Sequence, residues 1–175
     1  MRTHTPIQFV LQFDRSEIAE LVRRYEFEED TAAQEAGKRI AAGDYRRSHL
    51  ETIYEWKTKG RGRSRLELNT DDEITDALKL AVQARTDRAA LAVLKGLHGV
   101  DVPVASAILT AINPSRFTII DFRALEALGV TDVVSTVDLF ISYCAFCRNL
   151  ANECKLSLRD LDRALWQWSK ERSSF

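Results

Sequence analysis

Helical periodicity is the feature of this sequence that most restricts its fold. Apolar residues recur three and four positions apart along nearly the whole chain, as in Ile18, Leu21, Val22 and Tyr25. This spacing places them on one face of an α-helix. Residues 117–120 (FTII) are the only strand candidate, and a lone strand forms no sheet. The pattern predicts an all-α fold of about eight or nine helices.

Capping signals divide this pattern into separate helices. The pairs Asp14–Glu17 and Ser48–Glu51 match the capping box, in which the two side chains satisfy backbone N–H groups reciprocally. The Asn113-Pro114 pair ends a helix, because a residue before proline avoids the helical region. The other expected N-caps are Asn69 or Thr70, Thr86, Asp121, Thr136 and Ser157.

The length and apolar content of the chain indicate a globular protein without a membrane span. Its 175 residues fit one all-α domain over 1–175, or two helical lobes that share a core. No apolar run approaches the roughly 20 residues that span a bilayer. The apolar stretch near the N-terminus is too short for a secretory signal, so we expect a cytoplasmic protein. Three cysteines, which cannot all pair with one another, also fit a reducing compartment.

A basic segment (residues 57–65, KTKGRGRSR) stands out from a chain whose net charge is only −1. It contains no acidic residue, and its two glycines would allow the backbone to approach a ligand closely. Such a segment contacts phosphates in a nucleic-acid-binding protein, whereas in other proteins it is a solvated surface loop. Its five cations are Lys57, Lys59, Arg61, Arg63 and Arg65.

Residues 94–129 carry the most informative motif. Leu97, the Gly99–Val100 turn and Ala105 lie between two expected helices, and Asp121 follows Ala105 by 16 residues, after an apolar stretch. This arrangement resembles the helix-hairpin-helix of the endonuclease III and alkyladenine DNA glycosylase superfamily, here over 87–113. The resemblance implies a DNA-glycosylase-like fold, DNA as the partner, and Asp121 as the catalytic carboxylate.

The physical chemistry of the motif fits that resemblance. A tight turn between two helices directs backbone N–H groups toward one point, which suits a phosphate oxygen, and glycine there avoids a Cβ that would hold the phosphate away. We therefore expect DNA contacts along the turn. A carboxylate behind the turn can stabilise an oxocarbenium-like sugar or activate water. Asp121 is equally well placed to act only as an N-cap. The turn residues are Leu97, His98, Gly99, Val100 and Asp101.

An extruded base requires a pocket beside the acid, and Tyr54, Trp56 and Phe117 are the candidate aromatic residues, although aromatic residues at helical spacing are usually core. Pro103 occupies the position where bifunctional members of the family carry a Schiff-base lysine, which implies a monofunctional enzyme or a relative without catalytic activity. Asp101 replaces the second turn glycine of the family. It either opposes phosphate binding or caps the following helix, in whose first turn proline is tolerated.

We expect neither a metal nor a cofactor. Some family members bind an iron–sulfur cluster through four cysteines, but this chain has three, Cys144, Cys147 and Cys154, with different spacing. Buried free cysteines are common core residues. His98 has no histidine or cysteine at ligand spacing.

The sequence thus predicts a DNA-glycosylase-like protein that acts in base excision repair as a hydrolase of N-glycosidic bonds. The alternative is a catalytically inactive helix-hairpin-helix module that binds nucleic acid or another protein. The position of Asp121 distinguishes them: an open cleft bordered by the basic segment favours the enzyme. The recognised base and the oligomeric state stay open.

Overall fold

The computed structural model describes residues 7–26 and 29–173, and within them the fold is all-α, as predicted. These residues form ten α-helices, one short 3-10 helix (η1, Arg15–Glu17) and no strand. The α-helices are α1 (Ile18–Arg23), α2 (Thr31–Ala41), α3 (Arg47–Thr58), α4 (Arg63–Leu66), α5 (Asp71–Gln83), α6 (Asp87–Lys95), α7 (Val102–Ile112), α8 (Phe122–Glu126), α9 (Val137–Cys154) and α10 (Leu158–Arg172).

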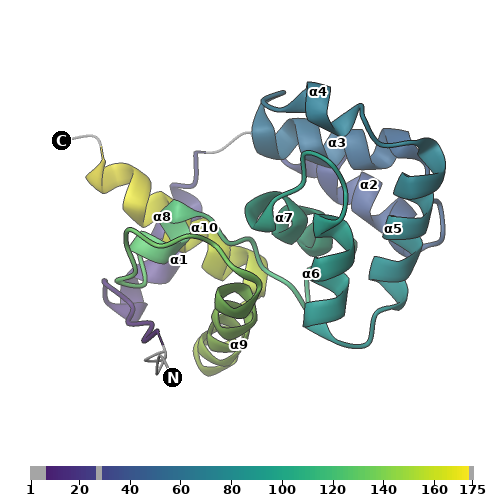
Figure 1. The fold of residues 1–175 in the computed structure, drawn as a ribbon. Coiled ribbons are helices and arrows are strands. Elements are labelled where there is room, and N and C mark those ends of the chain that lie inside the picture. The colour runs from purple at the N-terminus through teal and green to yellow at the C-terminus, as the bar shows by residue number, and fades with distance from the viewer. Residues whose placement is uncertain (1–6, 27–28, 174–175) are drawn as a thin grey trace, which may run out of the picture.

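The helices gather into two groups (Figure 1). Helices α2 to α7 form one group, called here the hairpin lobe, in which α2 packs on α3 and α7, and α5 packs on α6. Helices α1, α8, α9 and α10 form the other, called the α10 lobe, in which α1 and α8 both pack on α10. Helix α9 also contacts α6 and α7. The buried apolar side chains of both lobes belong to one continuous core.

Most predicted caps are present. The Asp14–Glu17 capping box opens η1, which leads into α1, and Thr70 rather than Asn69 caps α5 through a second capping box with Glu73. Side-chain oxygens likewise cap five further helices. Their N-cap residues are Thr86, Asp101, Asp121, Thr136 and Ser157.

Two local predictions were wrong. Ser48 is not the N-cap of α3, which begins at Arg47, with Arg46 as an N-cap in extended conformation and without a side-chain cap. The basic segment is not one loop, because Lys57 and Thr58 complete α3 and Arg63 begins the short α4. This four-residue helix, preceded by Gly62 in the left-handed conformation, is the one missing from the predicted count.

None of the described helices is long and apolar enough to cross a lipid bilayer.

Candidate functional site

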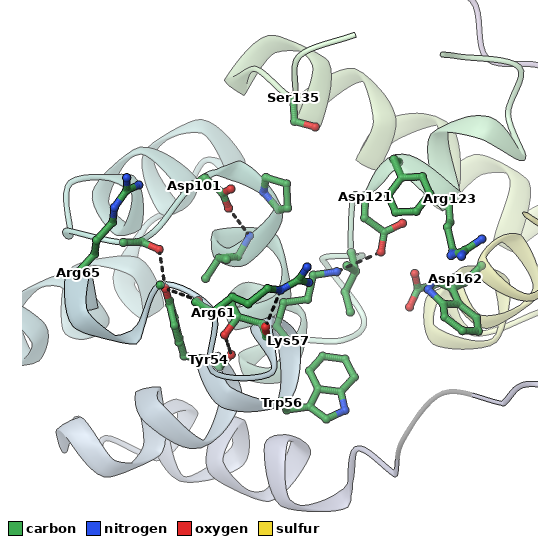
Figure 2. A pocket seen from close by; sticks show the side chains of 18 of the residues that line it. Tyr54, Trp56, Lys57, Arg61, Arg65, Asp101, Asp121, Arg123, Ser135 and Asp162 are labelled. Atoms are coloured by element: carbon green, nitrogen blue, oxygen red, sulfur yellow. Dashed lines mark hydrogen bonds and ion pairs between the residues drawn. The ribbon is translucent and has the colours of Figure 1, made fainter. Parts of the chain in front are cut away.

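A cleft of about 720 Å³ lies between the two lobes (Figure 2). The hairpin lobe contributes the end of α3, the following basic residues, the turn before α7 and the first turn of α7. The other wall comes from the start of α8 and from α10. A cavity of this size is in the usual range for small-molecule sites, and we call it the interlobe cleft.

Asp121 lines the interlobe cleft at the end of an extended segment (residues 117–120) that has no partner strand. Side chains of both lobes satisfy the backbone of this segment instead. The Ile120 amide donates to Ser106 Oγ of α7 at 3.1 Å, and the Ile119 carbonyl accepts from Tyr143 Oη of α9 at 2.8 Å. Since buried backbone groups require partners, these two contacts fix the backbone that carries Asp121.

The carboxylate of Asp121 has two different contacts. Oδ1 accepts from the Ala124 amide at 3.0 Å, so Asp121 is the N-cap of α8. Oδ2 accepts from Lys57 Nζ at 3.0 Å. The side chains of Lys57 and Asp121 are 15% and 19% exposed, respectively, so the pair is shielded from solvent yet borders the cleft. The capping role and the cleft position therefore occur together.

Asp162 is a second carboxylate in the cleft, which sequence reasoning missed. It projects from α10, is 5% exposed, and pairs through Oδ2 with the Arg159 guanidinium. The pKa of Asp162 is raised to about 6, because burial and the Asp121 charge raise it by more than the cations Arg159 and Lys57 lower it. One signal could have revealed it: Asp162 lies in the apolar stripe of its helix, between Leu161 and Leu165.

Arg159 connects this carboxylate to the aromatic side chains of the cleft. Its guanidinium binds both Asp30 and Asp162 and lies 5.6 Å from the centre of the Trp56 ring and 5.7 Å from that of Tyr25. Such cation–π distances are favourable. Arg159 therefore holds the inner end of the cleft in a fixed arrangement.

The three predicted base-pocket residues have different surroundings. Trp56 lines the cleft, together with Tyr25 and Trp166, which were not predicted. Tyr54 also borders it, but its hydroxyl donates to the carbonyls of Arg61 and Gly99, so it ties the basic segment to the hairpin turn. Phe117 was misplaced, because it is buried against Phe140 and lies outside the cleft lining.

The basic segment borders the cleft with only some of its cations. Lys57, Arg61 and Arg65 line it, whereas Lys59 and Arg63 lie outside the lining. Arg63 instead pairs with Glu67 at 3.3 Å on the surface. The geometry of the turn after α3 thus divides the segment into cleft-facing and outward-facing charges.

The hairpin turn (residues 96–101) packs against this segment. Gly99 has a φ of +79°, and a Cβ there would lie 3.0 Å from the Leu66 amide nitrogen and 3.3 Å from Tyr54 Oη. The positive φ and the close contact within the protein are thus sufficient reasons for glycine at this position, independent of any bound phosphate. Buried Asn69 braces the turn by bonding the His98 carbonyl and amide at 3.0 and 2.8 Å.

The remaining turn residues divide between core and surface. The side chains of Leu97 and Val100 are buried, so only the backbone of these two residues can contact DNA, while His98 is exposed but outside the cleft lining. Asp101 lines the cleft and caps α7 by accepting from the Val104 amide at 3.0 Å, with Pro103 in the first turn. The capping interpretation of Asp101 is therefore confirmed.

The cysteines contribute to the core rather than to the cleft. Cys144 and Cys147 are buried, and burial raises the pKa of the Cys144 thiol to about 12. Within residues 7–26 and 29–173, no group of three or more histidine, cysteine or acidic side chains is arranged to hold a metal ion.

Comparison with protein-family models, with curated proteins and with solved structures found no match to this chain.

Proposed function

We propose that this protein binds DNA across the mouth of the interlobe cleft, extrudes one nucleotide into it and hydrolyses the N-glycosidic bond of that nucleotide. The observation that carries the proposal is the position of Asp121: its carboxylate lines a cleft that Arg61, Arg65 and the hairpin turn also border. Enzymes that act on a base within duplex DNA must first bring it out of the stack into such a pocket.

The charges around the cleft support an anionic partner. Five cationic and three anionic side chains line it, although the whole chain carries a net charge of −1. The cations Arg61 and Arg65 are exposed and come from the hairpin lobe. Exposed arginines can displace counterions from phosphates, which provides most of the non-specific affinity for DNA.

The proposed reaction uses the negative charge of Asp121. The bond between C1′ and the base breaks, its electron pair leaves with the base, and positive charge develops on the sugar. A carboxylate beside C1′ stabilises that charge. Water then adds to C1′ and gives up a proton, for which Asp121 can act as general base, while the departing base takes up a proton. Lys57, 3.0 Å from Oδ2, orients the carboxylate in the free protein.

One observation favours a second candidate, a nucleic-acid-binding module without turnover. Both oxygens of Asp121 are already bound, Oδ1 by the Ala124 amide and Oδ2 by Lys57. A purely structural carboxylate would have the same contacts. On this alternative the cleft binds a nucleotide, but no bond is cleaved.

A panel of duplexes, each with one damaged or modified base, tests the proposal by assaying abasic-site formation. Asp121→Asn should lower base release by about 100-fold or more, because the amide keeps the cap but lacks the charge. Asp101→Asn is the matched control, since it removes one charge from the same cleft at another N-cap.

Equal rates for wild type and Asp121→Asn would show that Asp121 is not catalytic. DNA binding without base release from any duplex would favour the second candidate.

A further inference from the structure

Two carboxylates of the interlobe cleft, those of Asp101 and Asp162, have an oxygen that accepts no hydrogen bond from the described residues, and of these two side chains only Asp162 is buried. Asp101 and Asp121 both cap helices, and Asp121 also binds Lys57. Asp162 binds Arg159 through Oδ2, whereas Oδ1 accepts no hydrogen bond from the described residues and is not sealed from the cleft. A side chain that is 5% exposed and keeps an acceptor toward a cavity is suited to bind a ligand group.

Aromatic side chains line the same cleft as this open oxygen. Trp166 follows Asp162 by one turn of α10 and lines the same cleft. Trp56 of α3 lines this cleft as well (Figure 2). The Arg159 guanidinium, which holds Asp162, lies 5.6 Å from the centre of the Trp56 ring. A planar base between aromatic side chains would therefore present an edge, rather than a face, to Asp162.

We propose that Asp162 reads the edge of the extruded base and that the cleft selects guanine-type bases, which carry two adjacent N–H donors. The inference rests on the proposed function, because it assigns the substrate class of the same cleft. An ionised carboxylate only accepts hydrogen bonds, and each of its oxygens has two lone pairs, so Oδ1 can accept one of two parallel donors while Oδ2 accepts the other beside Arg159.

The four bases differ in the hydrogen-bond donors and acceptors that their edges present. Guanine presents its ring N1–H next to its exocyclic amino group, so two donors lie side by side. Adenine and cytosine place a ring acceptor next to their amino group, and thymine places a carbonyl on each side of its single N–H. An acceptor facing Oδ1 would leave two buried lone pairs opposed, which costs binding energy.

A nucleoside titration of the wild-type protein tests this without any catalytic step. We expect deoxyguanosine to quench tryptophan fluorescence at concentrations about 10- to 100-fold lower than deoxyadenosine or thymidine, as for a lost hydrogen bond to a charged group. Deoxyinosine, which lacks the amino group, and N1-methyldeoxyguanosine, which lacks the N1–H, should both bind more weakly than deoxyguanosine. The titration is run at pH 8, where Asp162 is ionised.

Two variants complete the test. Asp162→Asn should abolish the preference for deoxyguanosine, whereas Asp160→Asn, which alters a more exposed carboxyl group on the same helix, should retain it. A wild-type protein that prefers another nucleoside, that binds deoxyguanosine and N1-methyldeoxyguanosine equally, or that binds no nucleoside would overturn the inference. So would a preference that survives in a folded Asp162→Asn protein.

The duplex assay separates this inference from the proposed function. Release of pyrimidines but not of guanine-type bases would leave the glycosylase proposal in place and overturn the role of Asp162. A deoxyguanosine preference without release of any base would support the role of Asp162 and contradict the glycosylase.

Discussion

At the scale of single residues, the three carboxylates of the interlobe cleft are stabilised in different ways. Asp101 accepts only from a helix amide, and Asp121 from a helix amide and a lysine. Asp162 pairs with Arg159, is stabilised less strongly by the charge of Lys57, and is the most buried of the three. A buried ion pair loses much hydration, and the attraction between its charges does not always compensate for that loss. Of the three carboxylates, Asp162 therefore loses the most hydration free energy when it is ionised in the folded protein.

This difference predicts a pH dependence of stability. The pKa of Asp162 is about 6 in the folded protein and near 3.8 in an unfolded chain. Between these values the folded state binds more protons, so the contribution of Asp162 to the free energy of unfolding falls as the pH rises from about 4 to about 6. The change is roughly 3 kcal/mol at most, because one pKa unit corresponds to about 1.4 kcal/mol.

Urea unfolding of wild type and Asp162→Asn across this pH range measures the effect. The stability of wild type relative to the variant should be higher at pH 4.5 than at pH 7.5. Parallel stability curves for the two proteins would mean that Asp162 titrates normally.

At the scale of elements, the contact between α2 and α7 sets the position of the hairpin. Gly37 lies in α2, and a Cβ there would be 2.0 Å from the carbonyl oxygen of Ala111 in α7. The two backbones thus touch without an intervening side chain. Helix α7 also carries Asp101 at its N-terminus and Ser106, which holds the segment before Asp121. Close packing of α2 on α7 therefore fixes the position of the cleft residues that α7 carries or contacts.

Gly37→Ala should destabilise the protein, although alanine is the better helix former by about 1 kcal/mol. The added methyl group cannot fit, so α2 and α7 must separate, and overpacking of this kind costs about 1 to 3 kcal/mol. Chemical denaturation measures the loss. Gly43→Ala is not a suitable control, because the φ of Gly43 is +98°. Ala41→Gly, at an exposed position in the last turn of the same helix, measures the effect of helix propensity instead. A more stable Gly37→Ala protein would show that the two helices do not pack so closely.

Tyr143→Phe tests how the segment before Asp121 is held. The substitution keeps the ring but leaves the buried Ile119 carbonyl without its donor at 2.8 Å. We expect a loss of about 1 to 3 kcal/mol in the free energy of unfolding. Tyr45→Phe, on a partly buried tyrosine in the other lobe, is the matched control. Equal stabilities of wild type and Tyr143→Phe would mean that water replaces the hydroxyl.

Most elements could be predicted from sequence because their signals are local. The capping box at Thr70 and the cap at Asp121 each involve residues within one helical turn. Helix α4 could not be predicted, since four residues give no periodicity and its position depends on contact with the hairpin turn. Phe117 was misplaced for a related reason: its neighbour Phe140 lies in a distant helix that the local pattern does not identify.

At the scale of the whole molecule, the cleft exists because two lobes from interleaved parts of the chain share one core. Helix α1 packs with α10, so the chain begins in the α10 lobe, forms the hairpin lobe and then completes the α10 lobe (Figure 1). Asp121 was predictable as a candidate, but its partner Lys57 is 64 positions away, and Asp162 lies in another helix again. These residues are brought together by tertiary packing, which cannot be predicted from the pattern of any single segment.

The same geometry predicts which basic residues contribute to DNA binding. Arg61 and Arg65 line the interlobe cleft, whereas Lys59 and Arg63 lie outside its lining. The double variants Arg61→Gln/Arg65→Gln and Lys59→Gln/Arg63→Gln remove the same net charge from one short segment. All four side chains belong to exposed residues, so each substitution should change stability by less than about 0.5 kcal/mol.

Only the cleft-facing pair should alter the salt dependence of DNA affinity. Each phosphate contact contributes about 0.9 to the slope of log K against log salt concentration, so loss of both arginines should flatten it by nearly 2. Fluorescence anisotropy with a labelled duplex, measured between low and physiological salt, gives the slope for each protein. The outward-facing pair should leave it nearly unchanged, because a reduced net charge alone removes no phosphate contact. Equal flattening in both variants would show that DNA follows the whole segment rather than the cleft.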